Sequence, residues 1–260
     1  MTRKDATWVA RAERIGMLSV VMAVYNEART VGEVIDQVLK LDLEGRLLEL
    51  IIVESNSTDG TRDIVRAYEH HPEVRVIYQD RPLGKGAAVR AGLAAATGEV
   101  VLIQDGDLEY SVEDYPALLE PIERGEVAFV LGSRHVRGKP MRHFAESRRT
   151  SVVLNAAHWF FTGLFDVTYG VRLRDPFTMY KVFRRECIDG LHFTSNRFDF
   201  DWELVGKLIR RGHVPLEVPI TYDSRDFESG KKVRLVRDPL TWFVACVRFR
   251  FVAIEPQPGP

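Results

Sequence analysis

Apolar residues along this chain follow two alternating patterns. Short apolar runs, typical of strands buried on both faces of a parallel sheet, give way to polar turns and then to apolar residues at helical intervals. The runs predict five strands, over residues 17–24, 49–53, 74–77, 100–103 and 127–131. The helical intervals predict helices between them, over residues 30–39, 61–70, 87–96 and 112–124. This alternation predicts an α/β fold, a mostly parallel twisted sheet with helices on both faces.

The second half of the chain follows a different pattern. A helix is predicted over residues 204–210, and a strand over residues 214–222, whose prolines place it at a sheet edge. Residues 240–254 are apolar and aromatic but contain Arg248 and Arg250, so they are too short and too charged to span a bilayer. Such a segment can lie on a membrane as an amphipathic helix, or pack against the domain or a second subunit. We favour packing.

Length and composition indicate an ordinary globular protein with one sizeable core. The chain has 260 residues, of which 45% are apolar and 28% charged. Its net charge of −1 argues against a general nucleic-acid-binding protein, which would need a positive field. The two cysteines are too few for a disulfide framework or a zinc site, so a reducing cytoplasm is the expected location. We expect no signal peptide and no membrane-spanning segment.

The predicted strand over residues 100–103 ends in an acidic turn, Asp105-Gly106-Asp107, with Glu109 two residues further on. Carboxylates at this spacing can present oxygens to one hard cation such as Mg²⁺ or Mn²⁺, which would hold a phosphate or diphosphate. The alternative is a solvated turn in which Gly106 supplies a positive φ. The rest of the chain favours the first interpretation.

Polar residues also follow the first two predicted strands, in Tyr25-Asn26-Glu27 and Glu54-Ser55-Asn56. In parallel sheets, ligands bind outside the carboxyl ends of the strands, where these loops and the acidic turn would meet. The first loop lacks the Gly-x-Gly-x-x-Gly of dinucleotide-binding proteins, and Gly84-Lys85-Gly86 lacks the spacing of a Walker loop. The interpretation that remains is a site that binds a nucleotide through a metal ion and side chains.

Two basic segments stand out against the even charge balance. Residues 134–150 contain six Lys or Arg and the single acidic residue Glu146. A second cluster comprises Arg225, Lys231, Lys232, Arg234 and Arg237. Each is either a solvated face or part of a pocket for anionic ligands, and a loop around Gly230 could close on a phosphate.

In order and spacing, five segments resemble the family-2 glycosyltransferases of GT-A fold, and most closely the dolichyl- or polyprenyl-phosphate sugar synthases. These segments are residues 20–27, 52–61, 84–86, 105–107 and 132–134. The resemblance extends over roughly residues 17–235. It implies transfer of a sugar from a nucleotide-diphosphate donor, usually with inversion, to a polyprenyl phosphate or to a small-molecule or glycan acceptor.

The resemblance also implies roles for particular residues. Asp105, Asp107 and Glu109 would hold Mg²⁺ or Mn²⁺, and Ala23, Tyr25 and Glu27 would line the nucleoside pocket, with Glu54 near the base or ribose. The complete set expected to contact the donor is Ala23, Tyr25, Glu27, Glu54, Asn56, Lys85, Asp105, Gly106, Arg134 and Lys231. The set expected in catalysis is Asp107, Glu203, Asp201 and Arg225.

The segment Asp199-Phe200-Asp201-Trp202-Glu203 offers candidates for a general base. A hydroxyl acceptor needs a base, and Asp201 or Glu203 would serve, whereas a phosphate acceptor is already anionic and needs none. Asp199 and Asp201 could instead be helix N-terminal acids favoured by the dipole. Likewise, His158-Trp159-Phe160-Phe161 either lines an acceptor groove or belongs to the core.

The expected organisation is an arm over residues 1–16, a glycosyltransferase domain over residues 17–235, and an amphipathic segment with a disordered tail over residues 236–260. Within the domain, residues 17–133 form the nucleotide-sugar half and residues 134–235 the acceptor half. Two other functions stay open: a sugar-phosphate nucleotidyltransferase and a non-catalytic nucleotide-sugar-binding protein. Peripheral membrane contact and a homodimer stay open as well.

Overall fold

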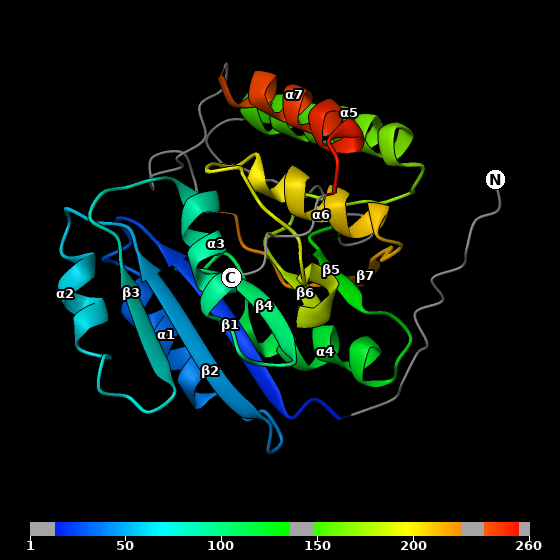
Figure 1. Cartoon of the computed structure of the whole chain (residues 1–260). Coiled ribbons are helices and arrows are strands. Elements are labelled where there is room, and N and C mark those ends of the chain that lie inside the picture. Colours follow the sequence, from blue (N-terminus) through cyan, green and yellow to red (C-terminus); the bar gives the residue numbers. More distant parts are fainter. Residues whose placement is uncertain (1–13, 136–147, 225–236, 255–260) are drawn as a thin grey trace.

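The computed structural model describes residues 14–135, 148–224 and 237–254. These residues form a seven-stranded sheet in the order β3-β2-β1-β4-β6-β5-β7 (Figure 1). The strands are β1 (Met17–Val24), β2 (Leu47–Glu54), β3 (Val74–Tyr78), β4 (Val100–Asp105), β5 (Phe129–Ser133), β6 (Lys181–Arg184) and β7 (Leu216–Pro219). All neighbours are parallel except β6, which runs antiparallel to both β4 and β5. The predicted mostly parallel sheet is confirmed.

Helices cover both faces of the sheet, as predicted. The helices are α1 (Val31–Lys40), α2 (Thr61–Arg66), α3 (Lys85–Ala95), α4 (Tyr115–Glu123), α5 (Arg148–Tyr169), α6 (Phe200–Arg210) and α7 (Arg237–Phe251), with short 3-10 turns η1 (Val112–Asp114) and η2 (Arg185–Ile188). Helix α3 packs on β1 and β2 in front of the sheet in Figure 1 and also contacts α6. Helices α5 and α7 contact each other and form an outer layer beyond α6.

Close packing on the front face depends on a glycine of α3. A Cβ on Gly92 would lie 2.3 Å from Cγ1 of Val21, so this face of the helix touches β1 directly. The central strands are buried on both faces, and every residue of β4 from Val100 to Gln104 is buried. This double burial explains why β1, β2 and β4 are apolar runs rather than alternating sequences.

Two elements of the second half are absent from the sequence prediction. Strand β6 inserts between β4 and β5, but its four residues, Lys-Val-Phe-Arg, are too few for a periodic signal. Helix α5 is the longest helix among the described residues, at 22 residues, and was not predicted. The strand expected over residues 214–222 is confirmed at the sheet edge but is limited to β7. The helix expected over residues 61–70 ends at Arg66.

None of the described helices combines the length and the apolar content needed to cross a membrane.

Candidate active site

The three polar loops lie side by side at one edge of the sheet. Val24 at the end of β1 pairs with Glu54 at the end of β2, and Ala23 pairs with Asp105 at the end of β4. The strands are parallel, so the loops that follow them leave the sheet at the same edge. The structure thus confirms that the loops converge as the sequence predicts.

Hydrogen bonds between the loops after β1 and β2 fix their backbones. The side-chain oxygen Oδ1 of Asn26, a residue with φ of 51°, accepts from the N–H of Thr58 at 2.9 Å. The N–H of Asn26 donates to Oγ of Ser57, and that of Glu27 donates to Oγ1 of Thr61. Sequence analysis missed this scaffold. Asn tolerates left-handed backbone, so Asn26 was the residue in the sequence that could have predicted this turn.

Glu54 belongs to this scaffold rather than to the exposed rim. Its side chain is 0% exposed and accepts from the N–H groups of Asn56 and Ser57 and from Nε of Arg62 at 2.5 Å. Burial opposes its ionisation, but hydrogen bonds from Ser57 and Arg62 outweigh burial and lower its pKa. Its carboxylate is enclosed by the loop that it stabilises, and the expected position of Glu54 near the base or ribose stays a prediction.

The expected nucleoside-pocket residues Ala23, Tyr25, Glu27 and Asn56 are all half-buried along this edge. Gly106 lies close by, and its carbonyl accepts from Oγ1 of Thr30 at 2.9 Å, which ties the start of α1 to the acidic turn. Thr30 therefore serves this contact and makes no side-chain cap on α1.

Close packing, and not a positive φ, favours glycine at position 106. A Cβ at this position would lie 3.2 Å from Cγ2 of Val24. The turn is therefore pressed against the end of β1.

The two aspartates of the acidic turn are held differently. Oδ1 of Asp105 pairs with Nζ of Lys85, the first residue of α3, at 2.5 Å, and the two side chains are 13% and 23% exposed. Asp107 is 6% exposed, and its Oδ1 accepts from the N–H of Glu109 at 3.0 Å. The ammonium of Lys85 thus stands where a cation would bind Asp105.

Glu109 is directed elsewhere. Its Oε2 accepts from the hydroxyl of Tyr222 at 3.1 Å, and its carbonyl accepts from the N–H of Asp223. Within the described ranges, no three His, Cys, Asp or Glu side chains gather closely enough to hold a metal ion. Glu109 of the expected metal set is thus hydrogen-bonded to Tyr222, and the set of Asp105, Asp107 and Glu109 stays a prediction.

Asp105 and Asp107 alone still offer a suitable donor set for a divalent cation. Both present hard carboxylate oxygens at the end of one strand, and Lys85 shows that positive charge is stable there. A cation held by two carboxylates would complete its coordination with phosphate oxygens and water.

The glycines of Gly84-Lys85-Gly86 permit a close approach between protein segments. A Cβ on Gly84, where φ is +103°, would lie 2.3 Å from the carbonyl oxygen of Asn196. A Cβ on Gly86 would lie 2.7 Å from Cβ of Phe200. The space beside Gly86 is filled by the segment leading into α6.

Helix α6 brings Asp201 to the same region. Asp201 pairs with Nζ of Lys181 on β6 at 2.7 Å, and the side chain of Lys181 is 0% exposed. Burial lowers the pKa of Lys181 against the opposing charge of Asp201. Lys181 also donates to the carbonyl of Thr178. The sequence does not predict the burial of Lys181, because lysine side chains are usually exposed to solvent.

Glu203 has a structural position. Its side chain is 0% exposed, pairs with Nζ of Lys207 at 2.6 Å, and accepts from the N–H groups of Thr194 and Ser195. Burial opposes ionisation, but Lys207 and the Ser195 N–H outweigh it and lower the pKa of Glu203. A lowered pKa, full burial and these hydrogen bonds favour a structural role for Glu203, and its expected role as a general base stays a prediction. The (i, i+4) spacing of Glu203 and Lys207 on a predicted helix could have predicted this ion pair from the sequence.

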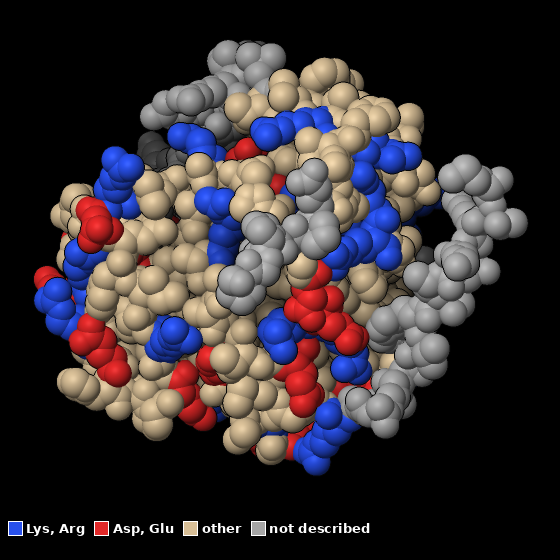
Figure 2. Space-filling view, viewed as in Figure 1, with Lys and Arg blue, Asp and Glu red and all other residues tan. Residues whose placement is uncertain are grey.

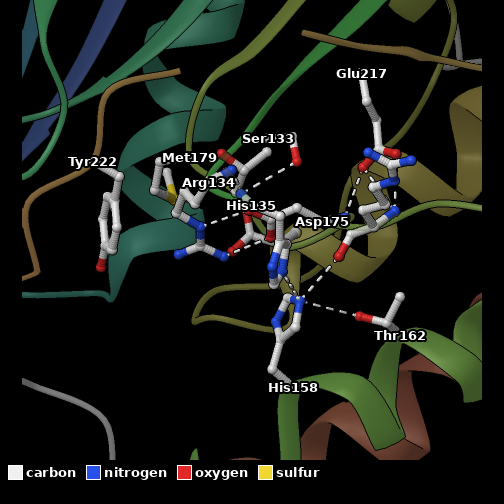
Figure 3. A network of polar contacts seen from close by, with 12 residues as sticks. Ser133, Arg134, His135, His158, Thr162, Asp175, Met179, Glu217 and Tyr222 are labelled. Atoms are coloured by element: carbon white, nitrogen blue, oxygen red, sulfur yellow. Dashed lines mark hydrogen bonds and ion pairs between the residues drawn. The ribbon is translucent and has the colours of Figure 1, made fainter. Parts of the chain in front are cut away.

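Arg134 follows β5 and forms a fork with Asp175. Its Nε and Nη2 each donate to the Asp175 carboxylate at 2.7 Å, and its backbone N–H donates at 3.0 Å (Figure 3). Burial opposes ionisation of Asp175, but the charge of Arg134 outweighs it and holds the pKa at about 2. The guanidinium also lies over the ring of Tyr222, at 5.3 Å. These contacts give Asp175 a structural role.

A pair of histidines lies beside this fork. Nε2 of His158 on α5 is 2.9 Å from Nε2 of His135 and 3.0 Å from the carbonyl of Arg174 (Figure 3). Burial lowers the pKa of His158 to about 4. In the same stretch of α5, Phe161 is buried while Trp159 and Phe160 are 51% and 64% exposed. The apolar stretch is thus split between core and surface.

Arg225 and Lys231 lie outside the described residues, as do the loop around Gly230 and the tail over residues 256–260. The residues just before Arg225 are described. Among them, Tyr222 and Asp223 form hydrogen bonds with Glu109 of the acidic turn.

A solved structure defines the class of fold. The glucosyl-3-phosphoglycerate synthase of Mycobacterium tuberculosis, crystallised with Mn²⁺, UDP-glucose and phosphoglyceric acid, superposes with a TM-score of 0.63. Its identity is 24%, and the match covers 88% of this chain and 79% of that one. The architecture is therefore that of the GT-A glycosyltransferases.

The sequence comparisons identify the family. Residues 19–191 match the family model described as Glycosyl transferase family 2, so the chain belongs to this family and the resemblance is confirmed. The chain is 29% identical over 247 residues to Glycosyltransferase AglD of Haloferax volcanii, covering 90% of this chain and 38% of that protein. It is 26% identical over 210 residues to the dolichol-phosphate mannosyltransferase of Pyrococcus furiosus, covering 80% and 57%. The chain thus spans less than two thirds of the length of both relatives.

Proposed function

We propose that this chain transfers a sugar from a nucleotide-diphosphate sugar to an acceptor, with inversion at the anomeric carbon. Family membership supports the reaction class. The observation that carries the proposal is the position of Asp105 and Asp107 at the carboxyl end of β4, beside the ends of β1 and β2. Ligands of parallel α/β sheets bind at this edge.

Asp105 and Asp107 would hold Mg²⁺ or Mn²⁺, which when bound would stabilise the negative charge that develops on the departing diphosphate. The M. tuberculosis structure was crystallised with Mn²⁺, which supports this choice of ion.

Donor contacts would come from several elements. The half-buried Ala23, Tyr25, Glu27 and Asn56 would surround the nucleoside, and Gly106 would approach through its backbone. Arg134 would contribute Nη1, because Nε and Nη2 face Asp175. Arg225 and Lys231 stay proposed donor contacts that rest on the family resemblance, because both lie outside the described residues.

The acceptor side carries a wide apolar surface. We name it the α5/α7 face, and it consists of the exposed side chains of Val152, Trp159, Phe160, Val167, Phe243, Val244, Val247 and Phe251. Their spacing is helical on both helices, and the two helices contact each other. The surface over α5 and α7 is tan and blue with little red in Figure 2. Exposed apolar side chains gathered on two contacting helices indicate an interaction site.

We propose a membrane surface as the partner of the α5/α7 face and a lipid phosphate as the acceptor. Aromatic side chains such as Trp159 and Phe251 favour the interface, and the exposed Arg248 and Arg250 would pair with anionic headgroups. The name of the P. furiosus relative supports a lipid phosphate. A phosphate acceptor needs no general base, which agrees with the structural position of Glu203. With a hydroxyl acceptor, Asp201 would be the remaining candidate.

The reaction is tested with purified chain, Mn²⁺ or Mg²⁺, and a panel of nucleotide sugars with polyprenyl phosphate. We expect release of free nucleoside diphosphate from one donor, and anomeric inversion in the product by NMR. In a parallel assay with nucleoside triphosphates and sugar 1-phosphates, release of pyrophosphate, with no nucleoside diphosphate released from the nucleotide sugars, would instead favour a sugar-phosphate nucleotidyltransferase. Metal-dependent binding without release, across hydroxyl and phosphate acceptors, would favour a binding protein.

The membrane partner is tested by sedimentation with vesicles of neutral or anionic lipid. We expect the chain to bind anionic vesicles and the Phe160→Ser/Phe251→Ser variant to lose binding. Leu47→Ser is the matched control, because Leu47 is 62% exposed on the distant end of β2. A concentration-dependent dimer in sedimentation velocity, abolished by the same double variant and with no vesicle binding, would assign the face to a second copy instead.

A further inference from the structure

Lys85 occupies the position at which a cation would meet Asp105. Its Nζ lies 2.5 Å from Oδ1 of Asp105, and both side chains are mostly buried. The start of α3 cannot easily move, because Gly84 and Gly86 pack directly on the segment of Asn196 and Phe200. The backbone of Lys85 is therefore fixed while its four-carbon side chain can still rotate.

A second carboxylate faces the same ammonium. Burial would lower the pKa of Lys85, but Asp105 and then Asp201 outweigh it and raise the pKa. Asp107 contributes in the same direction. Asp201 is held in place by its 2.7 Å contact with the buried Lys181. The ammonium of Lys85 thus lies among carboxylates, and a shift toward Asp201 would keep it in negative surroundings.

A divalent cation and an ammonium cannot share the same carboxylate oxygen. A cation that reaches Asp105 must displace Lys85, and the repulsion between the two falls if an anion arrives at the same time. A diphosphate is such an anion and can accept from the displaced ammonium.

We propose that Lys85 is a positioning residue that blocks the cation site of Asp105 until the nucleotide diphosphate arrives, and then shifts toward Asp201 and the diphosphate. This proposal rests on the proposed function, because it requires a cation at Asp105 and Asp107. It makes the binding of cation and nucleotide interdependent. By linkage, each then strengthens the binding of the other by the same factor.

The competing explanation is a static ion pair that only anchors α3. Under that explanation the charge of Lys85 has no effect on the nucleotide dependence of cation binding. The Lys85→Met variant separates the two, because it removes the charge and keeps most of the apolar stem.

The experiment titrates Mn²⁺ alone and monitors the electron paramagnetic resonance signal of the free ion, then repeats the titration with UDP or GDP. We expect wild type to bind Mn²⁺ weakly alone and at least about tenfold more tightly with one nucleotide. Lys85→Met should bind Mn²⁺ alone at least about tenfold more tightly than wild type and lose most of the nucleotide dependence. Lys85→Arg keeps the charge and should behave as wild type.

Lys40→Met is the matched control. Lys40 forms an exposed pair with Asp36 at 3.0 Å on α1, so its loss removes one positive charge elsewhere and should leave Mn²⁺ binding unchanged. Equal affinity of wild type and Lys85→Met for Mn²⁺ alone would overturn the proposal. Failure of wild type and Lys85→Met to bind Mn²⁺ with either nucleotide would instead overturn the metal site of the proposed function. Circular dichroism establishes that each variant is folded.

Discussion

Two carboxylates, Asp105 at the end of β4 and Asp175 in the segment between α5 and β6, are paired with cationic side chains in contrasting ways. Asp105 meets Lys85 through one contact, and both side chains keep some exposure, 13% and 23%. Asp175 meets Arg134 through a two-armed fork and an additional backbone N–H, at exposures of 0% and 7%. The first pair can exchange its partner, whereas the second is a permanent part of the fold. Charge alone does not distinguish a ligand site from a structural pair, but burial and the number of contacts do.

The Arg134–Asp175 pair should give the largest effect on stability. Asp175→Ala leaves the buried guanidinium without its counter-charge, which we expect to lower the free energy of unfolding by about 3–5 kcal/mol. Urea denaturation of wild type and variant measures the loss. An Arg134→Met/Asp175→Leu variant should lose less than Asp175→Ala, because no buried charge remains unpaired. A loss below about 1 kcal/mol in Asp175→Ala would show that this pair is as exchangeable as the first.

Lowering the pH should reduce the free energy of unfolding through His158, which lies beside the Arg134–Asp175 pair. Burial holds its folded pKa at about 4, below the ordinary value of 6.5. Below pH 6.5 the unfolded chain takes up a proton that folded His158 does not, so the free energy of unfolding falls as the pH drops from 6.5 to 4. The loss should be about 3 kcal/mol. Urea denaturation across this range, repeated with His158→Gln, should show a shallower slope in the variant. Replacement of the more exposed His71 by Gln should keep the slope.

Glu203 should behave like Asp175 and not like Asp105. Glu203→Gln removes the charge opposite Lys207 but preserves most hydrogen bonds, so we expect a loss of about 2 kcal/mol in the free energy of unfolding. The residual enzyme should keep the pH profile of kcat. Loss of the acidic limb of that profile, with stability unchanged, would instead assign Glu203 the role of general base.

The smallest effect on stability should come from the exchangeable pair. Lys85→Met is expected to change the free energy of unfolding by less than about 1 kcal/mol, because a single partly exposed contact is lost. Thermal denaturation without metal provides the measurement. A loss similar to that of Asp175→Ala would mean that Lys85 anchors α3, and would remove the contrast between the two pairs.

The sequence could predict the first half of the fold because its signals are local. The apolar run ending at Asp105 identifies both a buried strand and the end at which its carboxylates emerge. The same logic placed the loops of Asn26 and Glu54 at one edge, which the strand register confirms.

The second half depends on contacts between distant residues. Strand β6 exists because Val182 pairs with both Leu102 and Val130, neither of which is near it in the chain. Lys181 is buried only because α6 supplies Asp201. The glycines beside Lys85 are explained by Asn196, more than a hundred residues later. Local pattern carries no information about these partners.

The central claim is that Asp105 and Asp107 hold the cation that supports departure of the nucleoside diphosphate. The most direct measurement is the rate of nucleoside diphosphate release by wild type, Asp105→Asn and Asp107→Asn, with Mn²⁺ and after chelation. We predict that each substitution, and chelation, lowers the rate at least about a hundredfold while the folded state persists. Folded variants that release nucleoside diphosphate at the wild-type rate, or release that continues in the presence of a chelator, would contradict the account.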